Sequence, residues 1–177
     1  MLNSYRRYTF RPITPEDAAF VRRLYGMTLR SQMPFEEAGL TSEQIEALLD
    51  HQLEAQTRHY SGNYPDAEIS IIECGGEPVG RLIIIHFQNE LRLGDLMILP
   101  EHQNRGICTY IMNEYVAEGL ATGRVVRLHV EKFNRAVNLY LRQRFVVIED
   151  LASHWLMEYR PDGVADTVPQ GSEPTVS

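Results

Sequence analysis

The sequence predicts an α/β fold in which helices cover both faces of a mixed, mostly antiparallel central sheet. Three observations support this prediction. Apolar residues recur at helical spacing in two early segments, β-type apolar runs fill residues 69–99, and helical and strand-like segments alternate from residue 106 onward. Strands joined through crossover helices are expected to pair in parallel, and strands joined by short turns are expected to pair antiparallel.

The N-terminal part predicts a strand at Tyr8–Ile13 and then two helices. Thr14 can cap the first helix, and Pro15 suits its first position. The segment Ser31–Leu40 is expected to be a loop, and a second helix to begin at Thr41 or Ser42. Apolar stripes at helical spacing carry both assignments: Ala18, Val21, Leu24, Tyr25 and Leu29 in the first helix, and Ile45, Leu48, Leu49 and Leu53 in the second.

The central part predicts a three-stranded meander. Its strands are expected at Ile69–Glu73, Val79–Phe87 and Leu91–Leu99, with Pro100 ending the last. Cys74-Gly75-Gly76-Glu77 is typical of a tight hairpin turn.

The remaining part predicts alternating helices and strands. Their ranges are a helix from Gly106 to about Leu120, a strand at Val125–Val130, a short helix at Asn134–Gln143, and strands at Phe145–Ile148 and Ser153–Glu158. One domain over residues 1–160 accommodates all of these elements. Residues 161–177 are rich in Pro, Gly, Ser and Thr, so we expect a disordered tail there.

Composition excludes several classes of protein. The net charge is −7 without a basic stripe, which argues against nucleic-acid binding. The longest apolar stretch, Leu82–Ile85, is too short to span a membrane. No apolar stretch follows the two arginines near the N-terminus, so that segment does not have the pattern of a signal peptide. The two cysteines and six histidines have no metal-site or disulfide spacing. We therefore expect a cytoplasmic protein without a metal ion.

The strand before Pro100 leads through a polar turn to a helix that opens at Gly106. Free N–H groups at a helix start form an anion site, and a glycine lets an anion approach the backbone. Arg105 could add a charge contact. Taken alone, one glycine fits an ordinary strand–turn–helix connection almost as well.

The stretch Gln103-Asn104-Arg105-Gly106-Ile107-Cys108 resembles the pyrophosphate-binding motif of the GNAT (Gcn5-related N-acetyltransferase) family, Gln/Arg-x-x-Gly-x-Gly/Ala. The resemblance implies that these six residues hold the pyrophosphate of acetyl-CoA. It also implies that Leu96, Met97 and Ile98 lie alongside the pantetheine arm. Cys108 departs from the usual Gly or Ala. A helix N-terminus can lower a thiol pKa, but a packed, inert cysteine is the favoured interpretation.

A second resemblance to the same family begins at the strand Val125–Val130. It continues through Asn134, a short helix carrying Leu139-Tyr140, and Phe145. The resemblance implies that Asn134 contacts the cofactor arm and that Tyr140 reaches the sulfur as general acid. Without it, a helix cap and a core tyrosine explain both residues. Arg144 stands where the family commonly has Gly.

Two residues are candidates for the general base. His129 shares a strand face with Arg127 and Glu131 and titrates in a suitable range, although a structural histidine explains it equally well. Asp95, on the strand before the phosphate turn, is the second candidate.

The resemblance implies a GNAT-like acyl-CoA N-acyltransferase fold and an acetyl-CoA-dependent N-acetyltransferase that acts on a primary amine of a small molecule or protein. The acidic residues between Glu16 and Tyr60 would suit a cationic acceptor, and a solvated helix face explains them more simply. The alternatives are a non-catalytic acyl-CoA-binding module and, last, an unrelated nucleotide-binding protein. The acceptor, the acyl length and the oligomeric state, a homodimer included, stay open.

Overall fold

The computed structural model describes residues 8–33, 35 and 39–161. Its seven strands form one sheet in the order β1-β2-β3-β4-β5-β7-β6. The strands are β1 (Tyr8–Pro12), β2 (Glu68–Cys74), β3 (Glu77–His86), β4 (Glu90–Ile98), β5 (Val125–Glu131), β6 (Phe145–Asp150) and β7 (His154–Tyr159). The helices are α1 (Ala18–Gln32), α2 (Ser42–Asn63), α3 (Ile107–Thr122) and α4 (Val137–Arg142), with short 3-10 turns η2 (Pro15–Asp17) and η3 (Pro100–His102).

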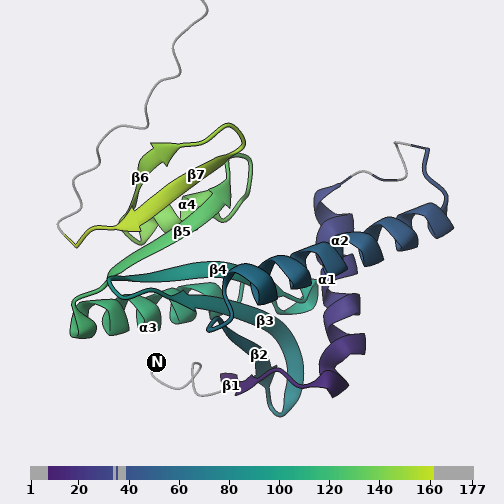
Figure 1. Ribbon diagram of the computed structural model, residues 1–177, viewed down its shortest axis with the longest axis horizontal. Helices are drawn as coiled ribbons and strands as arrows, with labels where there is room; N and C mark the ends of the chain where they lie inside the picture. Colours follow the sequence, from purple (N-terminus) through teal and green to yellow (C-terminus); the bar gives the residue numbers. More distant parts are fainter. Residues whose placement is uncertain (1–7, 34, 36–38, 162–177) are drawn as a thin grey trace, which may run out of the picture.

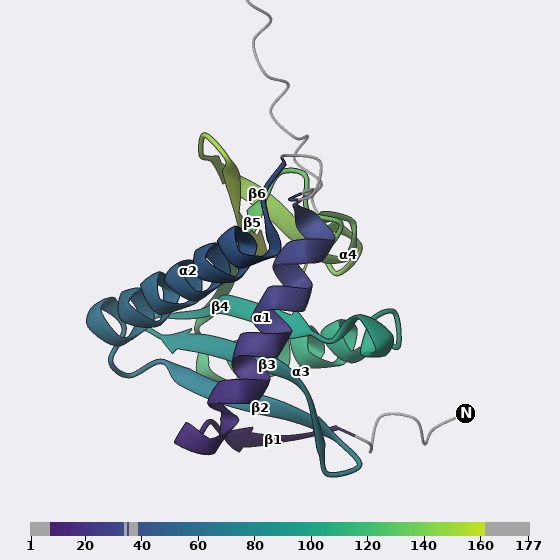
Figure 2. The same ribbon diagram turned by 90° about the vertical axis from the view of Figure 1, so that its right-hand side faces the viewer.

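Helices cover both faces of the sheet, which confirms the predicted fold class (Figures 1 and 2). The larger apolar core joins α3 and α4 to one face, through residues such as Ile111, Leu128 and Phe145. A smaller cluster on the other face packs Leu24 and Tyr25 of α1 against Met97 at the end of β4. The expected tail lies outside the described residues from residue 162 onward. So do Glu36 and Glu37, two of the acidic residues between Glu16 and Tyr60 that would suit a cationic acceptor.

Two expected strand pairings are wrong. β1 and β2 pair antiparallel although helices connect them, because two successive helices bring the chain back to the end of the sheet where β1 finishes. β5 and β6, joined through α4, do not pair at all. β7 lies between them and pairs antiparallel with both. The expected parallel pair is present only between β4 and β5, which α3 connects.

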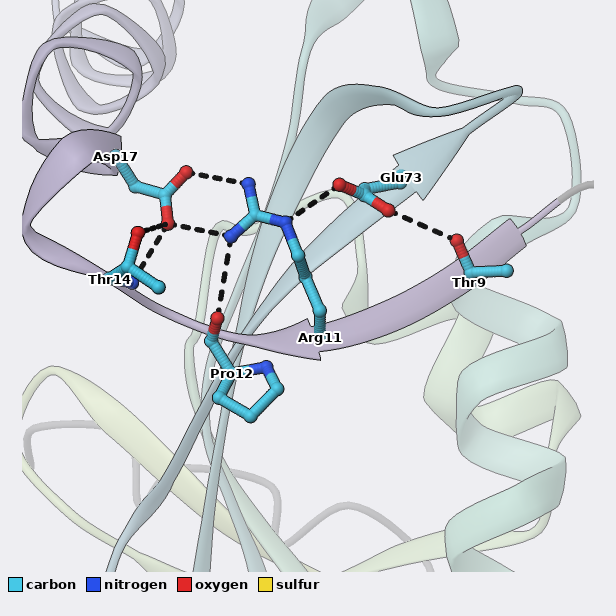
Figure 3. A network of polar contacts seen from close by, with 6 residues as sticks. All are labelled: Thr9, Arg11, Pro12, Thr14, Asp17 and Glu73. Atoms are coloured by element: carbon cyan, nitrogen blue, oxygen red, sulfur yellow. Dashed lines mark hydrogen bonds and ion pairs between the residues drawn. The ribbon is translucent and has the colours of Figure 1, made fainter.

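Arg11 fixes the start of the helical layer to the edge of the sheet (Figure 3). Its guanidinium donates two hydrogen bonds of 2.7 Å to Asp17 and one of 2.7 Å to Glu73 on β2. Asp17 also accepts from the Thr14 backbone N–H at 2.8 Å, which closes a capping box. The hydrogen bonds from Arg11 hold the pKa of Asp17 well below its usual range.

Several element boundaries differ modestly from the prediction. α1 continues through Gln32, into the segment expected to be a loop, and α4 is shorter than expected because it begins only at Val137. The hairpin between β2 and β3 is as predicted. Gly75 and Gly76 adopt φ values of 64° and 86°, which glycine accommodates without strain.

Candidate functional site

β4 and β5 pair along only part of their length. Their parallel register runs from Glu90 opposite Val125 to Leu93 opposite Leu128 and ends there. β4 continues to Ile98 and β5 to Glu131, and Figure 1 shows β5 leaving β4 at an angle. Within the described residues, a gap therefore opens between two neighbouring strands. Backbone groups that line it are available to a ligand that can accept and donate hydrogen bonds.

The backbone of β4 alternates between β3 and this gap. The Leu99 N–H donates to the Val79 carbonyl at 2.9 Å, so the backbone groups two residues earlier, at Met97, face β3 as well. Those of Leu96 and Ile98 point away from β3 and toward the gap. The Ile98 carbonyl accepts from Gln103 Nε2 at 2.9 Å. Met97 instead contributes its side chain to the cluster beneath α1.

A β-bulge at Gly94 decides which side chains of β4 face α1 and α2. Ile83 lies opposite Asp95 and Ile84 opposite Leu93, so Gly94 is an extra residue in β4. Before it, Leu93 reaches the core beneath α3, and after it Leu96 does. The bulge therefore turns Asp95 to the face that α1 and α2 cover.

Tyr60 of α2 holds the bulge in place. Its hydroxyl donates to the Gly94 carbonyl at 2.6 Å, and its ring lies so close that a Cβ at Gly94 would stand 3.0 Å from Cε1. Glycine is thus favoured there by the close approach of the ring, rather than by a positive φ.

The turn after β4 presents a row of backbone N–H groups. Asn104 and Gly106 adopt φ values of 58° and 82°, and Gly106 is the N-cap of α3. The first backbone bond of the helix runs from the Tyr110 N–H to the Gly106 carbonyl, so the N–H groups of the preceding turn have no intrahelical acceptor. Arg105 is exposed beside them. This arrangement fits an anionic group such as a pyrophosphate.

The first two residues of α3 have different environments. Ile107 is 2% exposed and belongs to the core, so its backbone is the part that can face an anion. Cys108 is half-buried, and burial raises the pKa of its thiol to about 11. Desolvation outweighs the opposing hydrogen bond with Tyr140, and the thiol stays protonated at neutral pH.

Tyr140 lies against Cys108 and is close enough to Asp95 to be influenced by its charge. Tyr140 is buried on α4, with its ring edge-on to Phe145 and its hydroxyl hydrogen-bonded to the Cys108 sulfur. Burial, followed by the nearby Cys108 and Asp95, raises the pKa of Tyr140. The phenol therefore carries its proton at neutral pH, as a general acid must.

Asp95 faces a buried cation. Arg81 on β3 donates from Nη2 to Asp95 Oδ2 at 2.5 Å and to Gln56 Oε1 of α2 at 2.6 Å. Burial raises the pKa of the Asp95 carboxyl, while Arg81 and the Leu96 N–H act in the opposite direction.

His129 lies elsewhere, on the exposed face of β5. Leu128 and Val130 are buried on the opposite face, which confirms the predicted alternation. Burial of the ring and the charges of Arg92 and His154 lower the pKa of His129. The imidazole is therefore neutral at pH 7. The charged groups that act on His129 differ from those that act on Tyr140, so the two residues have separate electrostatic environments.

Asn134 lies in the turn between β5 and α4. Its Oδ1 accepts from the Ala136 backbone N–H at 2.9 Å, so the side-chain oxygen stabilises the entry to the helix.

Three residues of this site were missed by sequence reasoning, and two of them had a signal. Gly94 interrupts a strand pattern, which is typical of a bulge, and Arg81 is a charge within an apolar run. Tyr60 had none, because its role depends on where α2 crosses β4. Among the described residues, no group of three or more His, Cys, Asp or Glu could hold a metal ion, and no helix is long and apolar enough to cross a membrane.

Comparisons with known proteins give one family and many similar structures. The model of the acetyltransferase (GNAT) family matches residues 31–145. PaiA N-acetyltransferase from Thermoplasma acidophilum, solved in complex with coenzyme A, is 19% identical with a TM-score of 0.64 over 86% of this chain and 98% of that one. An acetyltransferase from Thermus thermophilus is 23% identical with a TM-score of 0.58 over 86% and 95%. FdhC, a nucleotide-linked sugar GNAT, is 14% identical with a TM-score of 0.60 over 89% and 88%. No curated protein matches the chain.

Proposed function

The chain belongs to the acetyltransferase (GNAT) family, and we propose that it transfers an acetyl group from acetyl-CoA to a primary amine by direct attack of the amine on the thioester. The observation that carries the proposal is the gap between β4 and β5, which has Asp95 on the unpaired part of β4 and ends at the N–H groups before α3, where Tyr140 meets Cys108. The amine belongs to a small molecule or to a protein.

In this proposal the backbone positions the donor. The N–H groups of residues 104–108 bind the pyrophosphate, and the groups of Leu96 and Ile98 in the gap bind the pantetheine arm. Gln103 begins this turn, and its own N–H donates to the Pro100 carbonyl at 3.2 Å. Asn134, in the turn that follows β5, contacts the arm from that strand's side of the gap. A thioester held beside an amine reacts as if within one molecule, which alone lowers the barrier by several kcal/mol.

Two side chains move protons. Tyr140, which its raised pKa keeps protonated at neutral pH, donates its proton to the departing sulfur. We place the base at Asp95, because its charge acts on Tyr140 and it lies where the strands separate. His129 is the second candidate, since its lowered pKa leaves it able to accept a proton at pH 7.

Thiol release from acetyl-CoA over a panel of primary amines tests the proposal. Tyr140→Phe should lower kcat by about 10²–10⁴-fold, typical for loss of a general acid, while acetyl-CoA binding persists. Tyr159→Phe is the matched control, because its ring also packs against Phe145, 5.7 Å between centroids. Asp95→Asn and His129→Gln, compared in the same assay, identify the base.

Unchanged turnover in Tyr140→Phe would exclude its role as acid. Binding of acetyl-CoA without thiol release for any amine would favour the non-catalytic acyl-CoA-binding module instead. The absence of binding at millimolar acetyl-CoA would contradict both.

A further inference from the structure

Arg81 is a buried cation to which the proposed reaction gives no part. Its side chain is only 5% exposed, and it lies on β3 between apolar residues that fill the core. Nη2 donates to both Asp95 and Gln56, whereas Nε has no hydrogen-bond partner among the described residues. A charge in this position is costly, and an unpartnered buried donor adds to the cost.

Fold stability alone does not explain such a pair. Removing two charges from water costs about as much as their attraction returns, and apolar replacements of a buried pair are often neutral or stabilising. The neighbouring residues of β3, such as Val79 and Ile83, show that apolar side chains are accommodated in this strand. A buried, perturbed pair beside a proposed reaction centre therefore indicates a role in that centre.

Arg81 is also the cation that acts on Asp95. The groups that interact with this carboxyl come from several elements: Arg81 on β3 and the Leu96 N–H on β4 act on it directly, and its charge in turn acts on Tyr25 of α1, Tyr60 of α2 and Tyr140 of α4. The three tyrosines are neutral at pH 7 and give the carboxylate no charge to pair with. Burial favours the protonated acid, and Arg81 opposes it.

The same guanidinium ties Asp95 to α2. Through Gln56 it reaches the helix one turn before Tyr60, whose hydroxyl holds the Gly94 carbonyl. The bulge that orients Asp95 is thus fixed at two consecutive residues: Tyr60 of α2 binds the Gly94 carbonyl, and Arg81 of β3 binds the Asp95 carboxylate.

We propose, on the basis of the proposed function, that Arg81 is a positioning residue that keeps the Asp95 carboxylate ionised and fixed where β4 leaves β5. It touches neither donor nor acceptor. It acts on the reaction by presenting an unprotonated, oriented base to the acceptor amine.

Carbon-13 NMR of the aspartate carboxyl groups tests this without substrate. A cation at hydrogen-bond distance lowers a carboxyl pKa by about 1–3, so Arg81→Met should raise the pKa of Asp95 by that amount. Asp95→Asn identifies the resonance. Arg81→Lys, which retains the charge, should keep the titration near that of the wild type. Arg22→Met is the control, since the pair of Arg22 with Asp50 lies on exposed helix surfaces.

Enzyme kinetics supply the second measurement. In Arg81→Met, the acidic limb of kcat/KM for the amine should move to higher pH, while KM for acetyl-CoA stays unchanged. Arg81→Gln serves as a second neutral variant if the methionine variant does not fold.

An unshifted Asp95 titration in a folded neutral variant would overturn the proposal. So would a loss of activity that is equal at every pH, or failure of both neutral variants to fold, because either would assign Arg81 to the fold. If the wild type acetylates no amine, the proposed function fails, whereas the NMR titration still shows whether Arg81 controls Asp95.

Discussion

Replacing Gly106 by alanine separates the anion site from the stability of α3. Gly106 adopts φ = 82° as the N-cap, in the left-handed region of backbone conformation. A residue with a Cβ in this region destabilises the folded state by about 1–2 kcal/mol. For a domain of this size that lowers Tm by about 2–8 °C. The added Cβ also stands at the backbone turn where a pyrophosphate would approach, so we expect acetyl-CoA affinity to fall at least tenfold.

Gly123 provides a matched control at the other end of the same helix. It adopts φ = 66° as the C-cap, and a Cβ there would meet no atom within 4 Å. Gly123→Ala should therefore show the same backbone strain, and a similar loss of Tm, without any effect on the ligand.

Thermal unfolding with and without acetyl-CoA is the assay. At 100 times the dissociation constant, a ligand stabilises the wild type by about 2.7 kcal/mol, and a tenfold weaker ligand at the same concentration by about 1.4 kcal/mol. Gly123→Ala should keep the full ligand-induced rise in Tm, and Gly106→Ala about half of it. Equal rises in the two variants would refute the assignment of the anion site to this turn.

Two further predictions concern the scaffold. Asp17→Asn should destabilise the fold by about 1.5–3 kcal/mol at pH 7, because hydrogen bonds from the Arg11 cation are lost. Since the pKa of Asp17 is lowered in the folded state, its contribution is present above about pH 3.9 and lost as pH falls further, so the denaturation midpoints of variant and wild type should converge in acid. Gly119→Ala should lower the free energy of unfolding by about 1–3 kcal/mol, because its Cβ would lie 2.4 Å from Val126 Cγ2. Gly62→Ala, whose Cβ would have nothing within 4 Å, should raise the free energy of unfolding by about 0.5–1 kcal/mol in the same denaturant titration.

Local patterns predicted most of the elements, because each depends on a few neighbouring residues. The Gly75-Gly76 turn and the Thr14 cap are read from short stretches whose backbone preferences are strong. The pairing of β1 with β2 and the insertion of β7 beside β5 were not predictable in this way. They depend on how far each helix carries the chain across the sheet, and the rule for single crossover helices does not cover these cases.

The candidate site was partly predictable for a related reason. The turn before α3 carries its own sequence pattern, and the glycine at position 106 permits the positive φ found there. The contact between Tyr140 and Cys108 joins residues 32 positions apart on two helices, and Arg81 meets Asp95 across two strands. Such contacts depend on strand register, and the extra residue at Gly94 changes that register by one.

Gly94 also governs how this chain should be aligned with its relatives. In a chain without this extra residue, the residues of β4 that match those after Gly94 stand one position earlier in the strand. Deletion of Gly94 itself would leave Asp95 opposite Ile83 in a regular strand. Loss of a residue after Asp95 that removed the bulge would instead send Asp95 toward the apolar core under α3 and bring Leu96 out beneath α2. An alignment gap placed a few residues from its true position therefore exchanges a carboxylate for a leucine. Chain length in this strand thus constrains the site as firmly as the identity of any side chain in it.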